Sequence, residues 1–436
     1  AIYKLIRMVG GVTAACSDPA AERALGEFLR TVPAGRGQYG VNAFLEGYLD
    51  SLLTCGRAIG EIVPAAGNRE IAAVLWGRVE DIEIQEGRIL RVGKDLPRGE
   101  EDLAVDCEGS YTIVPGFVDV HIHGCGGADT CDGTREALET MARFLLERGV
   151  TSFCPTTMTT GRETIERALL AAKDMMDHPM EDGARVVGVN MEGPFIAKEK
   201  KGAQKEEDIL SPDFELFRHF YDLSGGIVRL VDIAPEQPGG YAFAEKASQL
   251  CTVSIAHTTA GYEQAKQAFD SGITHATHLF NAMNGLSHRA PGVVGAVFDD
   301  SRVRGELICD GFHIHPAVLR TAFQVLGDRA LVVSDSMRAN GMPEGEPFDL
   351  GGQMVTVHEG KATLADGTLA GSVSNLHQEV KNLVSFGIPF AQAVKAATLI
   401  PAQAIGMEEE IGSIAPGKRA DLVVLDEHLN IAAVYH

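Results

Sequence analysis

We predict an α/β protein built around a (β/α)8 TIM barrel, and three observations lead to this prediction. The chain has 436 residues, of which 45% are hydrophobic and only 6% aromatic, a composition that suits an aliphatic core. Apolar runs of strand length alternate with amphipathic, helix-like segments from residue 112 to residue 336. Histidines and acidic residues stand where several of those apolar runs end.

The N-terminal part has a different pattern from the rest of the chain. Its apolar residues recur at helical spacing, and Asp18 stands where a helix would begin. From about residue 70 the pattern changes to short alternating strands with a turn at Glu86–Gly87. We therefore expect three parts: a helical extension (1–69), a small β-sandwich domain from segments flanking the barrel (70–114 and about 365–436, with barrel-end helices), and the barrel (115–364).

The barrel strands are expected at eight apolar runs. These runs are residues 112–122, 151–157, 185–194, 228–236, 252–258, 273–280, 305–311 and 330–336. Helix-like segments separate most of them, such as residues 134–149, 162–177, 261–272 and 315–327. Parallel strands joined by helical crossovers are the pattern of such a barrel.

Charge and cysteine content exclude several classes of protein. There are 38 lysines and arginines against 60 aspartates and glutamates, a formal net charge of −22. Such a chain is a poor partner for nucleic acid or an anionic membrane, and an anionic substrate needs a local basic patch. The 8 cysteines form no CxxC pair and indicate a cytoplasmic protein. No apolar run reaches the roughly 20 residues of a membrane span.

The polar residues at the strand ends indicate a metal centre. A TIM barrel carries its chemistry at the carboxyl ends of its strands. Those positions hold His121, His123, Glu192, His257, His278, Asp310 with His313, and Asp335. Imidazole and carboxylate groups are ligands of Zn²⁺ and Fe²⁺, and residues two apart on a strand face the same side. We expect one or two divalent metals, with Zn²⁺ favoured and Fe²⁺ or another ion as the alternative.

Eight stretches resemble the amidohydrolase superfamily and, within it, the N-acetylglucosamine-6-phosphate deacetylases. They are "PGFVDVHIHG" (115–124), "MEGPFIAKEKKGAQ" (191–204), "AHTTAGYEQAKQAFDSGITHATHLFNAM" (256–283), "HRAPGVVGAVFDD" (288–300), "CDGFHIHP" (309–316), "VVSDSM" (332–337), "GTLAGSV" (367–373) and residues 397–426. The resemblance covers about residue 70 to residue 436. Residues 1–69 do not match these deacetylases and resemble a segment of a phage portal protein.

The resemblance implies roles for the strand-end residues. Glu192, His257 and His278 would hold one divalent metal, and His121 and His123 would belong to a second metal position. Asp335 would act as general base and then general acid. His313 would contact the sugar or the acetyl group and help to stabilise the oxyanion.

The resemblance also implies a set of substrate-binding residues. Ala203 and Gln204 would lie beside the sugar, and many relatives have a histidine where this chain has Gln204. Asn281, Ala282 and Arg289 would bind the phosphate, with Arg289 reaching across a homodimer interface. The pocket would be lined by Leu369, Ala370 and Gly371.

The function implied by the resemblance is hydrolysis of N-acetyl-D-glucosamine 6-phosphate to D-glucosamine 6-phosphate and acetate, in amino-sugar catabolism and cell-wall sugar recycling. One alternative is a deacetylase for N-acetylgalactosamine 6-phosphate or another amidohydrolase. A dihydroorotase-like enzyme is disfavoured, because it usually needs a carboxylated lysine and the strand-end acid here is Glu192. A non-enzymatic scaffold is the third hypothesis, motivated by residues 1–69.

Overall fold

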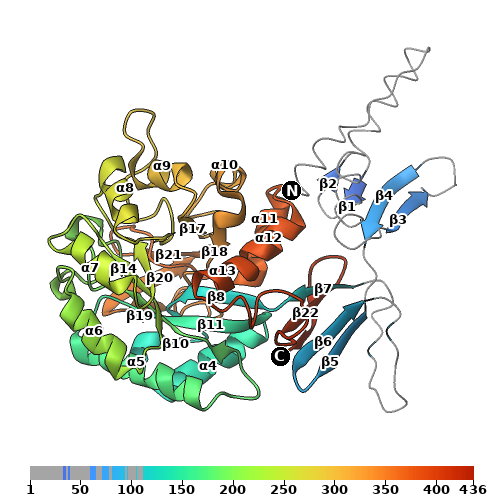
Figure 1. Ribbon diagram of the computed structural model, residues 1–436, viewed down its shortest axis with the longest axis horizontal. Helices are drawn as coiled ribbons and strands as arrows, with labels where there is room; N and C mark the ends of the chain where they lie inside the picture. Colours follow the sequence, from blue (N-terminus) through green and yellow to red (C-terminus); the bar gives the residue numbers. More distant parts are fainter. Residues whose placement is uncertain are drawn as a thin grey trace.

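The computed structural model describes residues 81–93, 96, 105 and 111–436 in full, together with the backbone of four short strands nearer the N-terminus. Eight parallel strands form the barrel (Figure 1). They are β8 (Phe117–Ile122), β11 (Val150–Thr157), β13 (Val189–Glu192), β14 (Val228–Ile233), β15 (Thr252–Ile255), β16 (His275–Ala276), β17 (Arg304–Leu307) and β18 (Ala330–Val332). The short β12 (Arg185–Val186) also pairs with β11.

The barrel closes between its first and last strands. Each strand from β13 to β17 pairs in parallel with the next, and β11 pairs with both β8 and β13. A parallel bridge joins Ile122 to Ser336, just beyond β18. This closure brings the ends of strands from opposite halves of the sequence to one rim, where barrel enzymes build their sites.

Helices cover the outside of the barrel (Figure 1). They are α4 (Arg135–Leu146), α5 (Arg162–Asp177), α6 (Phe214–Leu223), α7 (Gly240–Ala247), α8 (Tyr262–Asp270), α9 (Gly292–Asp299), α10 (Pro316–Leu326), α11 (Leu376–Ser385), α12 (Phe390–Ala396) and α13 (Leu399–Ala404). Helix α4 shows why these segments are helical. Thr134 caps its first turn, and Leu138, Met141 and Leu145 recur on the buried face.

The barrel strands are buried on both faces, as expected when helices pack outside and side chains fill the interior. Every residue of β8, β11 and β13 is buried. The interior nevertheless contains polar residues, among them Asp119, Asn190, Asp232 and Glu306, each 0% exposed. Buried charges are costly unless they are paired, protonated or bound to a metal, so this interior favours a functional role over a purely structural one.

A small β domain made from both flanks of the barrel lies to one side (Figure 1). It contains the hairpin β5 (Asp81–Gln85) and β6 (Arg88–Gly93), and the antiparallel sheet of β7 (Thr112–Pro115), β22 (Leu422–Leu425) and β23 (Ile431–Tyr435). The two sheets are joined at the turn before β22. There the Ile89 amide donates to the Lys418 carbonyl at 2.8 Å.

Residues assigned to the barrel from sequence include a separate antiparallel sheet that follows β18. Its strands are β19 (Pro347–Leu350), β20 (Gln353–His358) and β21 (Lys361–Leu364). Along β20, buried Val355 and Val357 alternate with exposed neighbours, so one face packs and the other meets solvent. The packed face joins Met158 and Met337 of the barrel rim in a second apolar cluster. We call β19–β21 the inserted sheet. The short strands β9 (Gly124–Cys125) and β10 (Ala128–Asp129) lie on the same rim.

The helical expectation for residues 1–69 is wrong at three short segments. These are the strands β1 (Pro33–Gly35), β2 (Gln38–Tyr39) and β3 (Ile59–Pro64), of which β3 pairs with β4 (Ile71–Gly77). The β-branched residues and the proline of β3 favour a strand over a helix interior, and this local preference outweighs the helical spacing. The other residues of 1–69, and the predicted resemblance to a portal protein, lie outside the described residues.

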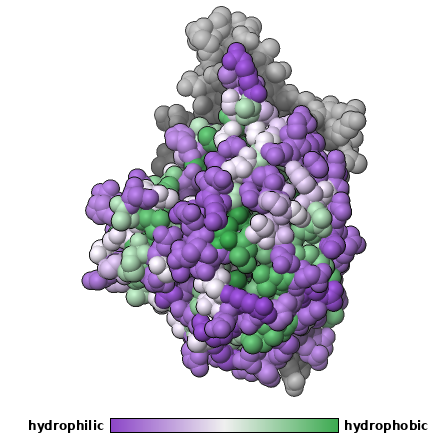
Figure 2. All heavy atoms as spheres, turned by 90° about the vertical axis from the view of Figure 1, so that its left-hand side faces the viewer, coloured by the Kyte–Doolittle hydropathy of each residue, from purple (hydrophilic) through white to green (hydrophobic). Residues whose placement is uncertain are grey.

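None of the helices that the structure describes is long and apolar enough to cross a membrane. Figure 2 shows the face that carries α6 and α7, where hydrophilic side chains surround smaller groups of apolar ones. Charged and polar residues are expected on such a surface, because they are rarely buried.

Candidate metal centre

Side chains from the ends of three barrel strands form the first ligand group, which we call the Glu192 group. Glu192 ends β13, His257 follows β15, and His278 follows β16. Glu192 Oε1 lies 2.9 Å from His257 Nε2 and 3.0 Å from His278 Nε2, and the two Nε2 atoms lie 3.1 Å apart. One carboxylate and two imidazoles converging on one point form a ligand set suited to Zn²⁺ or Fe²⁺.

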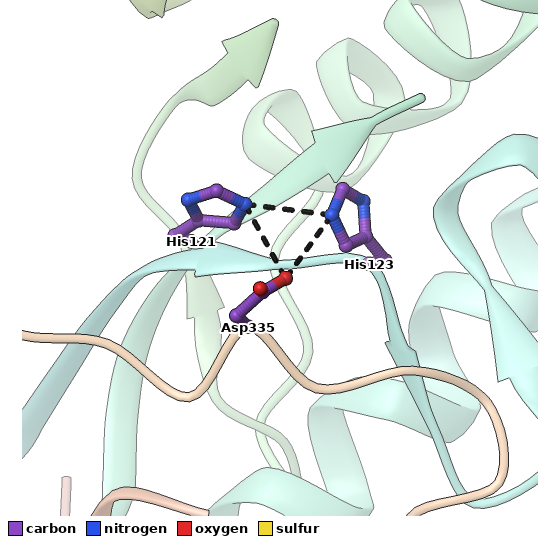
Figure 3. Close-up of side chains that lie close together, drawn as sticks. All are labelled: His121, His123 and Asp335. Carbon is purple, nitrogen blue, oxygen red and sulfur yellow. Dashed lines mark hydrogen bonds and ion pairs between the residues drawn. The ribbon is translucent and has the colours of Figure 1, made fainter. Parts of the chain in front are cut away.

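Three more side chains form a second set, the His121 group, shown in Figure 3. His121 and His123 come from the end of β8, and Asp335 follows β18. Their Nε2 atoms lie 3.4 Å apart, and Asp335 Oδ1 lies 3.6 Å from that of His121 and 3.4 Å from that of His123. The first and last strands of the barrel therefore supply this group together.

Glu192 connects the two groups. Its Oε2 lies 3.2 Å from His123 Nε2, and its Oε1 lies 3.7 Å from His121 Nε2. All six residues are buried, and the most exposed of them, Asp335, is 7% exposed. One carboxylate thus stands between two sets of imidazoles, an arrangement with room for one divalent metal or two.

The backbone at three of these residues is strained. His257, His278 and Asp335 have φ angles of 41°, 28° and 45°, in the left-handed region that non-glycine residues rarely adopt. Such a conformation costs on the order of 1–3 kcal/mol and persists where the surrounding structure enforces it, most often at functional sites. The strain therefore supports a functional role for the strand ends.

Three of the four histidines in the two groups have a hydrogen-bond acceptor at Nδ1. His257 Nδ1 donates to the Lys200 carbonyl at 2.7 Å, His123 Nδ1 to the Thr156 carbonyl at 3.2 Å, and His121 Nδ1 to Glu306 at 2.9 Å. An acceptor at Nδ1 fixes the tautomer whose Nε2 lone pair is free for a metal. These contacts therefore orient the imidazoles as ligands.

Glu306 is a site residue that sequence reasoning missed. It lies in β17, is 0% exposed, and accepts from His121 Nδ1 and from His275 Nε2 at 2.9 Å each. The backbone amide of His278 also donates to it, at 3.1 Å. The available signal was an acidic residue inside the apolar run "GELIC", because a charge in a buried strand needs a partner.

The electrostatics of the site favour a cation. Burial lowers the pKa of the His123 imidazole, but Asp335 and Glu192 outweigh this and raise it to about 10. Burial opposes ionisation of the Glu192 and Asp335 carboxyls, yet the histidines hold both pKa values below their ordinary range. The carboxylates are therefore ionised at neutral pH, and their negative charge suits a divalent cation.

His313 lies beside this centre and is held by Asp310. Asp310 Oδ2 lies 2.6 Å from His313 Nδ1, and its other oxygen accepts from the backbone amides of Phe312 and His313. Burial lowers the pKa of His313, but the bond to Asp310 outweighs it and the net shift is upward. The Nδ1–H is thus directed at Asp310, which leaves Nε2 as the other nitrogen available for a contact.

The other predicted site residues are distributed around the rim. Gln204 is 2% exposed and donates from Nε2 to Glu192 Oε2, while Ala203 precedes it. Gly371 lies against Asp335, because a Cβ there would stand 3.0 Å from the Asp335 carbonyl. Leu369 is 39% exposed and Ala370 is buried.

The predicted phosphate residues are not gathered in one contact cluster. Asn281 and Ala282 follow His278 directly, and Asn281 Nδ2 donates to the His278 carbonyl at 3.2 Å. Arg289 lies on an exposed loop and makes no hydrogen bond or ion pair with the described part of the chain. Its exposed guanidinium is therefore available to bind a ligand or a second protein chain.

A model of the amidohydrolase family matches residues 112–435, a range that contains both ligand groups. The chain belongs to the amidohydrolase family. The resemblance seen in the sequence is thereby confirmed.

As an amidohydrolase, the chain is similar to the N-acetylglucosamine-6-phosphate deacetylase of Lysinibacillus sphaericus, at 36% identity over 354 residues that cover 80% of this chain and 90% of that protein. It is similar to the N-acetylgalactosamine-6-phosphate deacetylase of Escherichia coli O157:H7, at 35% identity over 327 residues (74% and 86%). Among solved structures, it resembles a mutant N-acetyl-D-glucosamine-6-phosphate deacetylase from Mycobacterium smegmatis in complex with N-acetyl-D-glucosamine-6-phosphate, with TM-score 0.75, 32% identity and coverage of 84% and 94%.

Proposed function

We propose that this amidohydrolase hydrolyses the acetamide of N-acetyl-D-glucosamine 6-phosphate to give D-glucosamine 6-phosphate and acetate. The observation that carries the proposal is the position of Asp335, whose Oδ1 lies 3.4 Å from His123 Nε2 at the rim where Glu192, His257 and His278 converge. An ionised carboxylate beside a metal site is the arrangement that amide hydrolysis needs. The named deacetylases with 35–36% identity support the same class of substrate.

The residues present fit a divalent metal. Glu192, His257 and His278 would hold one ion, and His121 and His123 would contribute to a second position beside Asp335. Zn²⁺ suits this nitrogen and oxygen set, and Fe²⁺ is the alternative. A bound ion would supply Lewis-acid chemistry, which polarises an amide carbonyl and acidifies water.

Asp335 carries the proton transfers in this proposal. Its carboxylate takes a proton from the attacking water as the new C–O bond forms at the acetyl carbon. It then returns that proton to the amine nitrogen as the C–N bond breaks, which releases acetate and the amino sugar. His313, oriented through Nδ1 by Asp310, offers its Nε2 to the acetyl group or the oxyanion.

The phosphate is assigned to Arg289 with Asn281 and Ala282. A guanidinium binds two phosphate oxygens at once, and it supplies the local positive charge that an acidic chain needs for an anionic substrate. The exposed position of Arg289 supports a role across the interface of a homodimer. Leu369, Ala370 and Gly371 are proposed to line the sugar pocket, close to Asp335.

The cellular setting is proposed to be the cytoplasm, in amino-sugar catabolism and cell-wall sugar recycling. All five cysteines in the described region are free thiols: Cys125, Cys131, Cys154, Cys251 and Cys309. Unpaired cysteines in a large acidic protein suit a reducing compartment.

The test is a steady-state assay of the metal-loaded protein on phosphorylated and unphosphorylated N-acetyl sugars. We expect turnover of N-acetyl-D-glucosamine 6-phosphate and a much lower kcat/KM without the phosphate. For Arg289→Ala, kcat/KM for the phosphorylated sugar should fall by about 10–1000-fold, because a charged partner is lost. The value for the unphosphorylated sugar should stay the same. Equal loss on both sugars would remove the phosphate role, and no turnover of either would reject the function.

The second candidate is deacetylation of N-acetyl-D-galactosamine 6-phosphate, favoured by the similarity to the Escherichia coli deacetylase of that sugar phosphate. The two substrates differ only in the configuration of one hydroxyl group. A direct comparison of kcat/KM on the two sugar phosphates distinguishes the candidates.

A further inference from the structure

Both ends of the Gln204 amide are used by the protein itself. Gln204 is only 2% exposed, and its Oε1 accepts from the backbone amide of Thr159 at 2.7 Å. That donor determines which end of the amide is oxygen, because an N–H group cannot face another N–H group. Nε2 therefore faces Glu192 and donates to its Oε2.

The two oxygens of the Glu192 carboxylate therefore have different partners. Oε1 lies 2.9 Å from His257 Nε2 and 3.0 Å from His278 Nε2, where a metal would bind. Oε2 accepts from Gln204 and also lies 3.2 Å from His123 Nε2 of the His121 group. A carboxylate held at one oxygen cannot rotate freely, so Gln204 determines how Glu192 presents its other oxygen.

The inserted sheet holds the loop that carries Gln204. Gln353, at the start of β20, donates from Nε2 to the carbonyls of Ala203 at 2.8 Å and Gln204 at 3.2 Å. The sheet is itself fixed to the barrel rim, because buried Val355 packs in a cluster with Met158 and Met337. A chain of contacts therefore runs from the inserted sheet through the loop to a metal ligand.

We propose that Gln204 is a positioning residue for the metal ligand Glu192, and that Gln353 holds Gln204 in place. This assignment differs from the sugar contact that the family resemblance implies for Gln204. It rests on the proposed metal centre. A neutral amide suits the task, because it donates to Glu192 without adding a positive charge that would compete with the metal.

The test compares metal affinity with substrate affinity in three variants of the full chain. Gln204→Leu removes the donor to Glu192, and Gln353→Ala removes the contact with the loop. Met354→Ala is the matched control, because Met354 is the next residue of β20 and is 56% exposed. Apo protein is titrated with Co²⁺, followed by its visible absorption, and KM for N-acetyl-D-glucosamine 6-phosphate is measured at saturating metal.

We expect the Kd for Co²⁺ to rise about 10–100-fold in Gln204→Leu and by a smaller factor, still about threefold or more, in Gln353→Ala. KM at saturating metal should stay within about twofold, and Met354→Ala should match the wild type in both measurements. The inference is overturned if KM rises while the Kd for Co²⁺ is unchanged, since Gln204 would then bind the sugar.

Two further outcomes distinguish failure of this inference from failure of the proposed function. If Gln204→Leu does not fold, Gln353→Ala decides: an unchanged Kd for Co²⁺ overturns the inference and a raised one supports it. If the wild-type protein binds no Co²⁺, the metal centre itself is rejected, and the proposed function fails with it.

Discussion

The Glu192 carboxylate of the first ligand group also contacts the second, and the two groups differ in how closely their ligand atoms converge. In the Glu192 group the three ligand atoms lie 2.9–3.1 Å apart. In the His121 group the corresponding distances are 3.4–3.6 Å. The tighter group uses residues that have no other task in the proposed reaction, whereas the looser one includes Asp335, which must also move a proton.

The difference in ligand-atom distances indicates that the two groups have different roles in metal binding and proton transfer. Glu192 is held by Gln204 and His257 by the Lys200 carbonyl, as a permanent metal site requires. His121 is held by Glu306, whereas the Asp335 carboxylate contacts the two imidazoles of its own group. We expect the Glu192 group to retain metal and the His121 group to set the metal count and the proton chemistry.

The largest effect is expected when the tight group is broken. His257→Ala should remove the bound metal and lower kcat/KM at least about 10³-fold, because several kcal/mol of charge stabilisation are lost. Elemental analysis and steady-state kinetics measure the two effects. His358→Ala is the control, since His358 is an exposed histidine on β20, and it should keep both metal and activity. Full metal content in His257→Ala would contradict the expectation that the Glu192 group retains the metal.

Asp335→Asn separates proton transfer from metal binding. We expect kcat to fall about 10²–10⁴-fold, because the general base and acid is removed. The metal at the Glu192 group should remain, at one ion or more per chain by elemental analysis. An unchanged kcat would refute the proposed role of Asp335, and complete loss of metal would make it a structural ligand instead.

Glu306→Gln tests the support behind the looser group. A neutral amide oxygen is a weaker acceptor for His121 Nδ1, so the metal affinity of the His121 group should fall about 10–100-fold. Stepwise Co²⁺ titration should show the weaker binding step shifted and the tighter step unchanged. Glu379→Gln is the matched control, since Glu379 is also 0% exposed but accepts from the backbone of Cys309. A shift of both steps would mean that Glu306 supports the rim as a whole.

The smallest effect concerns Asp119, a buried acidic residue two positions before His121 in β8. Burial raises the pKa of Asp119 to about 7, and its Oδ2 has no hydrogen-bond partner. Below about pH 4 the folded and unfolded chains both keep the proton, whereas between pH 4 and pH 7 only the folded chain keeps it. Ionisation of the Asp119 carboxyl therefore lowers the free energy of unfolding as the pH rises from about 4 to about 7.

The corresponding variant is Asp119→Asn. It should stabilise the protein at pH 7 by roughly 1–3 kcal/mol and leave it unchanged near pH 4. Urea unfolding at the two pH values measures this difference. Equal effects at both values would show that hydrogen bonding, not ionisation, determines the role of Asp119.

Much of the site could be predicted because strand geometry is local. Residues two apart on a strand face one side, which places His121 and His123 together. Parallel strands end at the same rim, which gathers Glu192, His257, His278 and Asp335. Gln353 could not be predicted, because its contact with the Gln204 carbonyl depends on how a separate sheet packs against a loop 149 residues away.

The amino-acid sequence by itself determined the barrel, the family and the types of candidate ligand, because periodicity and the residue at each strand end are local properties. Only the tertiary structure decided that Glu192 stands between two ligand groups, that Glu306 supports His121, and that Gln204 faces a ligand. These relations join side chains from separate strands and loops. Their distances follow from barrel closure and side-chain packing, which no single segment encodes.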